Sequence, residues 1–297
     1  MSSEESFIAG LRKLARAAGA RGLADDAAVL DFGGETLVLT HDAMVEGIHF
    51  LRDQDPADIA WKLVATNISD LAAKGSEPVG VLLGYQLGPG GESFLRGLGE
   101  ALEHFGAPLL GGDTVGAAGP RSFGLTALGR ATHRPVPSRS GARPGDGVWV
   151  TGPLGAAMLG FEALRDGSGA DSLAYRRPGG RLREGRQLAP HVTAMMDISD
   201  GLLLDARRMA GASGVTIDIA TALVPIATPE ERRNDAMRWG DDYELLFTLP
   251  ASGQPPVPAT RIGSVTVRRE APLLCDGHDA GQTALGFEHG RPEDRRC

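Results

Sequence analysis

The sequence contains few cysteines, few lysines and no long hydrophobic run, and each scarcity excludes a class of protein. Its two cysteines, Cys275 and Cys297, define no disulfide framework. No apolar stretch approaches the length that spans a membrane. The first eight residues, Met1 to Ile8, lack the basic flank and apolar centre of a signal peptide, so we expect a cytoplasmic protein.

A net charge of −8 has the wrong sign for a protein that binds nucleic acid or anionic lipid through a broad basic surface. We therefore expect no nucleic-acid partner and no membrane partner, and a small charged ligand is the better expectation. The hydrophobic fraction of 42% and the charged fraction of 23% are typical of a globular protein. A chain of 297 residues is long enough for two domains.

The common nucleotide-binding and hydrolase motifs are also missing. None of the three lysines, Lys13, Lys62 and Lys74, follows a glycine, so there is no Walker loop, and no G-x-G-x-x-G occurs. The triplet Asp31-Phe32-Gly33 matches the metal-binding triplet of protein kinases, but no His-Arg-Asp loop precedes it. The G-x-S-x-G and H-E-x-x-H motifs are absent as well. Any phosphate chemistry must therefore depend on other residues.

Hydrophobic periodicity predicts a mixed α/β chain that is interrupted near its middle. In the first half it predicts helices at 5–18, 56–74 and 92–105, and strands at 27–30, 36–40, 79–87, 107–110 and 122–131. In the second half it predicts helices at 155–165, 181–189, 201–211 and 229–238, and strands at 148–151, 192–198, 215–219, 244–249 and 260–267. The segment 133–147 is rich in proline and glycine. We therefore predict two α/β domains, 1–135 and 145–297.

The sequence does contain seven aspartates that lie where apolar runs end. They are Asp25, Asp26, Asp42, Asp70, Asp113, Asp197 and Asp200. Carboxylates that the folding of the chain brings together repel one another and raise each other's pKa values unless a cation lies between them. Hard oxygen ligands without a cysteine or histidine cluster favour magnesium or manganese over zinc. The set predicts one divalent-metal site assembled from distant segments.

Each acidic motif also has a purely structural interpretation. The pair Asp25-Asp26 fits a turn in which a side chain bonds to its own backbone. Asp70 fits the polar stripe of a helix, with Lys74 as its i,i+4 partner. The segment 111–114 fits a tight turn or a close backbone approach to phosphate. The segment 197–200 fits a helix N-cap or a phosphate site at a helix start.

Taken together and in order, these motifs resemble thiamine-monophosphate kinase, a family in the superfamily that includes aminoimidazole ribonucleotide synthetase. The similarity runs through nearly the whole chain. Its matching segments are 25–29, 42–50, 55–58, 67–73, 111–114, 139–146, 197–202 and 242–247. The resemblance implies two α/β domains with mixed sheets, and a homodimer formed by pairing the sheets of the first domains.

The resemblance also implies an activity and a set of site residues. The activity is direct transfer of the γ-phosphoryl group of ATP to thiamine monophosphate, which gives thiamine diphosphate and ADP. Catalysis would depend on Asp197 and Asp200. Several Mg²⁺ ions would be held by Asp26, Thr40, Asp42, Asp70, Asp113, Asp197 and Asp200. ATP would be bound by Gly112, Asp113, Arg139 and Ser199, and the thiamine substrate by His49, Asp241 and Phe287. The chain departs from the family pattern at His41, where threonine is usual, and at Asp241, where glutamate is usual.

Two other classes of function stay open at this point. One is another ATP-dependent enzyme of the superfamily, such as aminoimidazole ribonucleotide synthetase or the hydrogenase-maturation dehydratase. The dehydratase ends in a reactive cysteine, and this chain ends in Cys297. The other class is a nucleotide sensor that binds without catalysis. Turnover of ATP on addition of thiamine monophosphate would separate the kinase from both.

Overall fold

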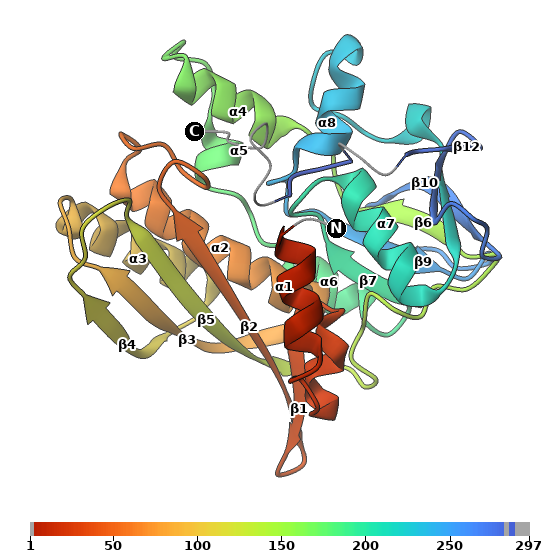
Figure 1. Ribbon diagram of the computed structural model, residues 1–297, viewed down its shortest axis with the longest axis horizontal. Coiled ribbons are helices and arrows are strands. Elements are labelled where there is room, and N and C mark those ends of the chain that lie inside the picture. The colour runs from red at the N-terminus through yellow and green to blue at the C-terminus, as the bar shows by residue number, and fades with distance from the viewer. Residues whose placement is uncertain (1–2, 282–284, 289–297) are drawn as a thin grey trace.

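The computed structural model describes residues 3–281 and 285–288, and it contains two β-sheets that lie side by side (Figure 1). The first sheet comes from the first half of the chain and the second sheet from the second half. Between them, residues 132–146 form no helix or strand. Within the described ranges, no helix combines the length and the apolar character needed to cross a membrane.

The first sheet has five strands in the order β1-β2-β5-β3-β4. Their bounds are β1 Ala28–Phe32, β2 Glu35–Val45, β3 Ser76–Gln86, β4 Leu109–Val115 and β5 Ser122–Ala131. All neighbours are antiparallel except β3 and β4, which are parallel and are joined through a helix. The N-terminal helix α1 (Ser3–Arg12) and the 3₁₀ helix η1 (Ala18–Leu23) precede this sheet.

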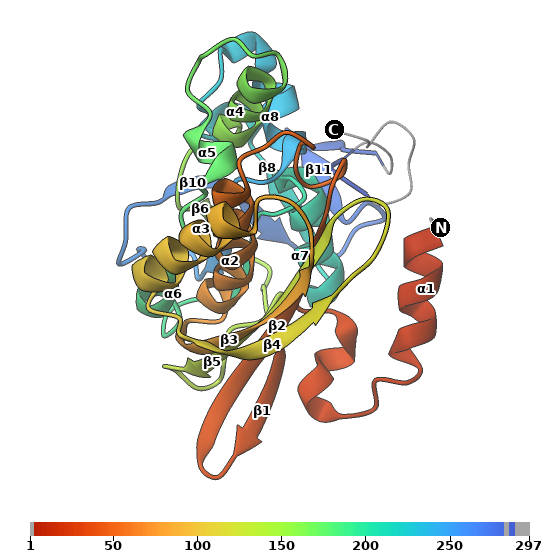
Figure 2. The ribbon, with the colours of Figure 1, turned by 90° about the vertical axis from the view of Figure 1, so that its left-hand side faces the viewer.

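Helices α2 (Pro56–Ala73) and α3 (Gly91–Phe105) cover one face of the first sheet. The start of α2 is fixed by Asp55, whose side chain accepts a hydrogen bond from the Ala57 amide at 3.0 Å. Figure 2 shows both helices on one side of the sheet. On the other side the 3₁₀ helix η1 packs against β1, whereas Leu82 of β3 and all residues of β4 are exposed. That open face is apolar, because Leu82 on β3 and Leu110 on β4 are 47% and 55% exposed.

The second sheet has seven strands in the order β12-β11-β8-β10-β6-β9-β7, antiparallel except for β11 and β8. Their bounds are β6 Gly147–Val150, β7 Ala194–Asp197, β8 Thr216–Ile219, β9 Leu245–Leu249, β10 Thr260–Thr266, β11 Leu273–Cys275 and β12 His278–Asp279. The helices of this half are α4 Ala156–Arg165, α5 Leu173–Arg176, α6 Leu182–Leu188, α7 Leu202–Ser213 and α8 Arg233–Trp239, with 3₁₀ helices η2 Thr221–Leu223 and η3 Glu230–Arg232.

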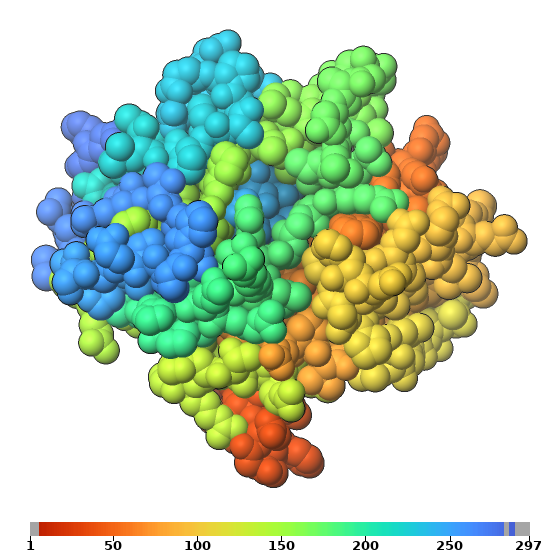
Figure 3. Space-filling model, turned by 180° about the vertical axis from the view of Figure 1, so that it is seen from behind, coloured from red at the N-terminus to blue at the C-terminus, as the bar shows by residue number. Residues whose placement is uncertain are grey.

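Helix α2 is the element that joins the two halves. Fifteen of its eighteen residues are buried, which is more than an amphipathic surface helix would bury. One side of α2 packs in the core of the first sheet, and its last residues, Ala72 and Ala73, pack with Met195 of β7 and Leu188 of α6. Seen from behind, the green segments of the second half lie against the yellow segments around α3, and little of α2 is visible between them (Figure 3). Side chains of α2 can therefore reach both halves.

Most predicted elements are confirmed to within a few residues, but two strands are longer than predicted. Strand β2 continues through His41 and Asp42 to Val45, and β4 includes the segment 111–114 that was interpreted as a turn. The predicted helix 5–18 is replaced by α1 followed by η1. The short elements α5, η2, β11 and β12 were not predicted.

Candidate active site

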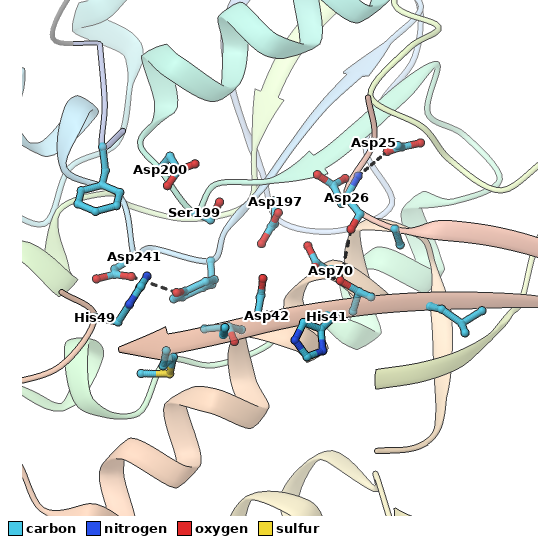
Figure 4. Close-up of a pocket in the computed structure, with 18 of the residues that line it drawn as sticks. Asp25, Asp26, His41, Asp42, His49, Asp70, Asp197, Ser199, Asp200 and Asp241 are labelled. Carbon is cyan, nitrogen blue, oxygen red and sulfur yellow. Dashed lines mark hydrogen bonds between the residues drawn. The ribbon is translucent and has the colours of Figure 1, made fainter. Parts of the chain in front are cut away.

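A cavity of about 740 Å³ lies where the two halves meet, a volume in the range of small-molecule sites. Eleven of the predicted site residues line it, namely Asp26, Thr40, Asp42, His49, Asp70, Arg139, Asp197, Ser199, Asp200, Asp241 and Phe287. Figure 4 shows Asp26 and Asp70 toward one end of the cavity and His49 and Asp241 toward the other. The fold thus brings together residues that are up to 261 positions apart in the chain.

Three carboxylates form the centre of the acidic end. Asp26 precedes β1, Asp70 lies in α2 and Asp197 ends β7, and one oxygen from each lies within 4.8 Å of the other two. The hydroxyl of Thr40 donates to Asp70, and the Ser69 hydroxyl donates to Asp197 at 2.7 Å. These hydrogen bonds fix the orientation of two carboxylates without supplying any positive charge.

The electrostatics of this cluster favour protonation or a cation. Burial, together with the nearby charges of Asp42 and Asp197, raises the pKa of Asp70 well above its ordinary value. Burial and the charge of Asp26 raise the pKa of Asp197 to about 8, and burial also raises the pKa of Asp42. A divalent cation between the oxygens would remove this cost, because it favours the ionised form of every ligand.

Asp42 lies in a strand that was predicted to end before it, whereas Asp70 lies in the helix that was predicted over 56–74. Asp42 lies inside β2, where alternation turns Thr40 and Asp42 toward the same face of the sheet. Asp70 lies inside α2, on the side of the helix that faces the cavity. Asn67, one turn earlier, accepts a hydrogen bond from the Asp42 amide at 3.1 Å and so ties the strand to the helix. Regular elements, not turns, therefore carry these two carboxylates.

Lys74 binds carboxylates that lie outside α2. The structural interpretation of Asp70 paired it with Lys74 along the helix, but the fully buried Lys74 ammonium binds Asp25 and Asp26, the latter at 2.6 Å. Arg139 also binds Asp26, with Nε at 2.5 Å from the carboxylate. Burial would raise the pKa of Asp25, but Lys74 and Arg21 hold it well below its usual range. Lys74 therefore anchors the acidic pair that precedes β1.

The loop that carries Asp200 is shaped by two residues that sequence reasoning missed. Both oxygens of Asp205 are used, since one accepts from the amides of Ser199 and Asp200 and the other binds Arg208. Arg208 also binds the Asp200 carboxylate directly. The only signal in the sequence was that Asp205 and Arg208 follow Asp200 within the first turns of the predicted helix.

Two predicted residues do not reach this cavity within one chain. Gly112 and Asp113 lie in the edge strand β4 and are not among the described residues that line the cavity. The glycine is explained by strand pairing, because a Cβ at position 112 would lie 2.0 Å from the Leu83 carbonyl oxygen. Asp113 is exposed and binds the amide of Thr114 at 2.9 Å.

His41, which departs from the family pattern, borders the cavity but has a partner elsewhere. Its Nδ1 lies 2.9 Å from the Thr126 hydroxyl, across the pairing of β2 with β5. Neighbouring residues of a strand face opposite sides, so the side chain of His41 is directed away from those of Thr40 and Asp42. Figure 4 shows the side chains of His41 and Asp42 on opposite sides of β2.

Comparison with known proteins identifies the class that this fold and site define. The model of the N-terminal domain of AIR synthase related proteins matches residues 24–131, and the model of their C-terminal domain matches residues 143–271. Among curated proteins, the thiamine-monophosphate kinase of Caulobacter vibrioides is 36% identical, over 90% of this chain and 85% of its own. The one from Escherichia coli K12 is 35% identical, over 90% and 91%. The chain therefore belongs to the thiamine-monophosphate kinase family, and it is an ATP-dependent kinase.

Solved structures agree with this assignment. The structure of AaThiL complexed with AMPPCP and TMP has a TM-score of 0.86 and 28% identity, and the alignment covers 96% of this chain and 98% of that one. The thiamine-monophosphate kinase of Stenotrophomonas maltophilia K279a has a TM-score of 0.75 and 32% identity, over 93% and 96%. Hydrogenase maturation protein HypE, at 22% identity and a TM-score of 0.67, shares the fold alone. The predicted family and fold class are confirmed.

Proposed function

We propose that this protein transfers the γ-phosphoryl group of ATP to the phosphate of thiamine monophosphate, giving thiamine diphosphate and ADP. The observation that carries the proposal is the cavity in which Asp26, Asp70 and Asp197 converge opposite His49 and Asp241. Its two ends suit the two parts of such a reaction, namely a polyphosphate with its cations and an organic acceptor. A cytoplasmic location is part of the same proposal, since the curated relatives are bacterial biosynthetic enzymes.

The donor set at the acidic end fits Mg²⁺. Its groups are carboxylates and one hydroxyl, the hard oxygen ligands that Mg²⁺ prefers, and Asp70 and Asp197 have raised pKa values that a cation would offset. We assign the metal-holding role to Asp26, Thr40, Asp42, Asp70, Asp197 and Asp200. Bound Mg²⁺ would supply neutralisation of charge on the phosphate oxygens, which phosphoryl transfer requires.

The protein's own residues then have defined tasks. Arg139 and Ser199 lie beside the acidic cluster and are assigned to the nucleotide phosphates. His49, Asp241 and Phe287 are assigned to the thiamine substrate, and the Phe287 amide binds the Asp200 carbonyl at 2.9 Å. The acceptor phosphate is already a nucleophile at neutral pH and needs no strong base, so we propose direct transfer without a phosphorylated enzyme.

We also propose that the protein is a homodimer formed through the open face of the first sheet. Leu82 and Leu110 on this face, with Leu109 and Val115 along β4, are 47–55% exposed, and a patch of this kind marks an interaction site. Pairing of two such faces would bury it. Gly112 and Asp113 lie on the same strand β4, outside the cavity of their own chain. Their assigned roles toward ATP and Mg²⁺ therefore require the cavity of the partner.

The decisive test of the function is an ADP-release assay with ATP, Mg²⁺ and one of three acceptors. We expect turnover with thiamine monophosphate, and at least about 100-fold less with free thiamine or with formylglycinamidine ribonucleotide, because a site built for one acceptor rejects those that leave its polar groups unpaired. Turnover with formylglycinamidine ribonucleotide instead would identify a synthetase. Binding of both ligands without ADP release would identify a sensor. Cys297, which carried the dehydratase alternative, lies outside the described residues.

The raised pKa values predict how Mg²⁺ stabilisation depends on pH. Without metal, Asp70 and Asp197 stabilise the fold while protonated. This contribution is complete below the unfolded pKa of 3.8 and is lost as the pH rises, for Asp197 through about 8. Mg²⁺ binds the ionised ligands, so we expect it to raise the unfolding midpoint by more than about 4 °C at pH 8.5 and by less than about 2 °C at pH 5.5.

Thermal unfolding in EDTA and in Mg²⁺ across this pH range checks that expectation. The control is Asp70→Asn, which removes the Asp70 charge at every pH and should unfold with little response to Mg²⁺. An equal Mg²⁺ effect at both pH values, or an unchanged response in the variant, would contradict the assignment of this cluster as the metal site.

A further inference from the structure

The substrate end of the cavity contains a buried cation whose role the proposed reaction does not explain. Lys62 lies in α2 with 1% of its surface exposed. Its Nζ is 3.1 Å from the Asp241 carboxylate and 3.3 Å from the His49 carbonyl oxygen. The ammonium also lies 3.9 Å from the centre of the Tyr175 ring. A lysine is rarely buried without such partners, since losing hydration is costly.

Lys62 connects the two residues assigned to the acceptor, which come from different halves of the chain. His49 follows β2 in the first half, and Asp241 precedes β9 in the second. The Tyr175 hydroxyl also donates to the His49 carbonyl at 3.1 Å, so that oxygen accepts from two buried groups. The His49 ring is held as well, because its Nδ1 accepts from the Val45 amide at 3.0 Å. In the neutral ring the proton is therefore on Nε2.

The backbone around Asp241 is held in a conformation that needs external support. Asp241 and Tyr243 have φ values of 58° and 51°, in the left-handed region that non-glycine residues seldom adopt. The Asp241 amide donates to the Ser199 carbonyl at 2.8 Å, and the Tyr243 amide donates to the Ile198 carbonyl at 2.9 Å. These bonds fix the segment beside the loop that carries Asp200.

The orientation of the Asp241 carboxylate is set by two further groups. Its Oδ1 accepts from the Tyr243 hydroxyl at 3.0 Å, and its Oδ2 faces Lys62. Tyr243 belongs to the same strained segment, whereas Lys62 comes from the other half of the molecule. Lys62 is thus a contact from the first half that helps to determine where this carboxylate lies in the cavity.

We propose that Lys62 is a positioning residue for acceptor recognition, which sets His49 and Asp241 at a fixed separation and keeps the carboxylate directed at the organic part of the acceptor. This inference rests on the proposed function. Asp26 and Asp70 lie toward the other end of the cavity (Figure 4), and Arg139 binds Asp26 there. Loss of Lys62 should therefore impair binding of thiamine monophosphate while leaving nucleotide binding intact. A purely structural role would impair both.

The test is Lys62→Met, which keeps most of the length and the apolar stem of the side chain and removes its charge. We expect the KM for thiamine monophosphate to rise roughly 10- to 100-fold, with the KM for ATP and kcat within about threefold of the unmodified protein. Lys13→Met is the matched control, because Lys13 is exposed and lies outside the cavity. Lys62→Arg serves if the methionine variant does not fold, since it keeps the charge but alters its geometry. It should show the same selective change at smaller size.

A double-mutant cycle with Asp241→Asn shows whether Lys62 acts through that carboxylate. We expect the double variant to lose less affinity for thiamine monophosphate than the product of the two single losses. Asp241→Asn leaves the buried Lys62 ammonium without this carboxylate, and Lys62→Met leaves the partly exposed Asp241 carboxylate without this ammonium. Equal increases in both KM values, or independent effects in the cycle, would overturn the inference. If the unmodified protein releases no ADP with thiamine monophosphate, the proposed function is wrong. If the unmodified protein is active but the Lys62 variants behave otherwise than expected, only the inference about Lys62 is wrong.

Discussion

Replacing Asp200 by asparagine is expected to lower kcat on the order of 10²- to 10³-fold, while the KM for thiamine monophosphate should change by less than about threefold. The reason is the location of the carboxylate. Asp200 lies in the turn before α7, lines the cavity and is held by Arg208, whereas the residues assigned to the acceptor are His49, Asp241 and Phe287. Asparagine keeps the shape but removes the charge, so it should affect the charged transition state more than the bound acceptor.

Steady-state kinetics of the variant, with each substrate varied in turn, provide the measurement. Asp166→Asn is a suitable control, because Asp166 is exposed just after α4 and its carboxylate pairs with the neighbouring Arg165. Comparable losses in kcat and in affinity for thiamine monophosphate would contradict the assignment of Asp200 to the phosphoryl-transfer end. Full activity in the variant would remove Asp200 from the site altogether.

Leu82→Asp should convert the proposed dimer to a monomer and lower kcat on the order of 10²-fold, because it places a charge at the centre of an apolar face that a partner would cover. The loss of activity is expected since Gly112 and Asp113 of the same chain lie outside the cavity. Light scattering measures the mass, and the ADP assay measures the rate. Leu223→Asp is the matched control, because Leu223 is 56% exposed in the second half of the chain.

Complementation separates a shared site from mere loss of stability. Asp113→Asn chains and Asp200→Asn chains are each expected to be nearly inactive. If β4 of one chain completes the cavity of the other, a mixed dimer contains one intact site, so mixing the two variants should restore up to roughly a quarter of the normal rate. A monomeric unmodified protein, or a mixture without recovery, would contradict the shared site.

The sequence predicted most helices and strands because their periodicity is local. The apolar stripe of 56–74 and the turn residues that follow it are sufficient to define α2, whatever packs against it. Predictions from local sequence were wrong where sheet pairing decided the conformation. Residues 111–114 have the composition of a turn, yet β3 pairs with them and makes them a strand. The short elements β11 and β12 were missed because they have too few residues to show a period.

The residues of the candidate site were likewise predictable only in part. The aspartates were recognisable because their type and spacing match a family pattern, and eleven predicted residues do line one cavity. The partners of those residues were not recognisable. Lys74 was considered only as a possible helix partner of Asp70, but it binds Asp25 and Asp26 across the structure. On sequence grounds, Lys62 was mentioned only to show that it does not belong to a Walker loop, and Arg208 was not mentioned.

What the sequence determined by itself is therefore the order of elements, the family and the chemical type of the ligands, because these depend on residue identity and on local spacing. Only the tertiary structure decided which carboxylates lie within reach of one cation. It also decided which lysine faces which aspartate. The physical reason is that ionic contacts and pKa shifts depend on separation in space and on burial. In this protein both are set by the packing of α2 between two sheets that are distant in the chain.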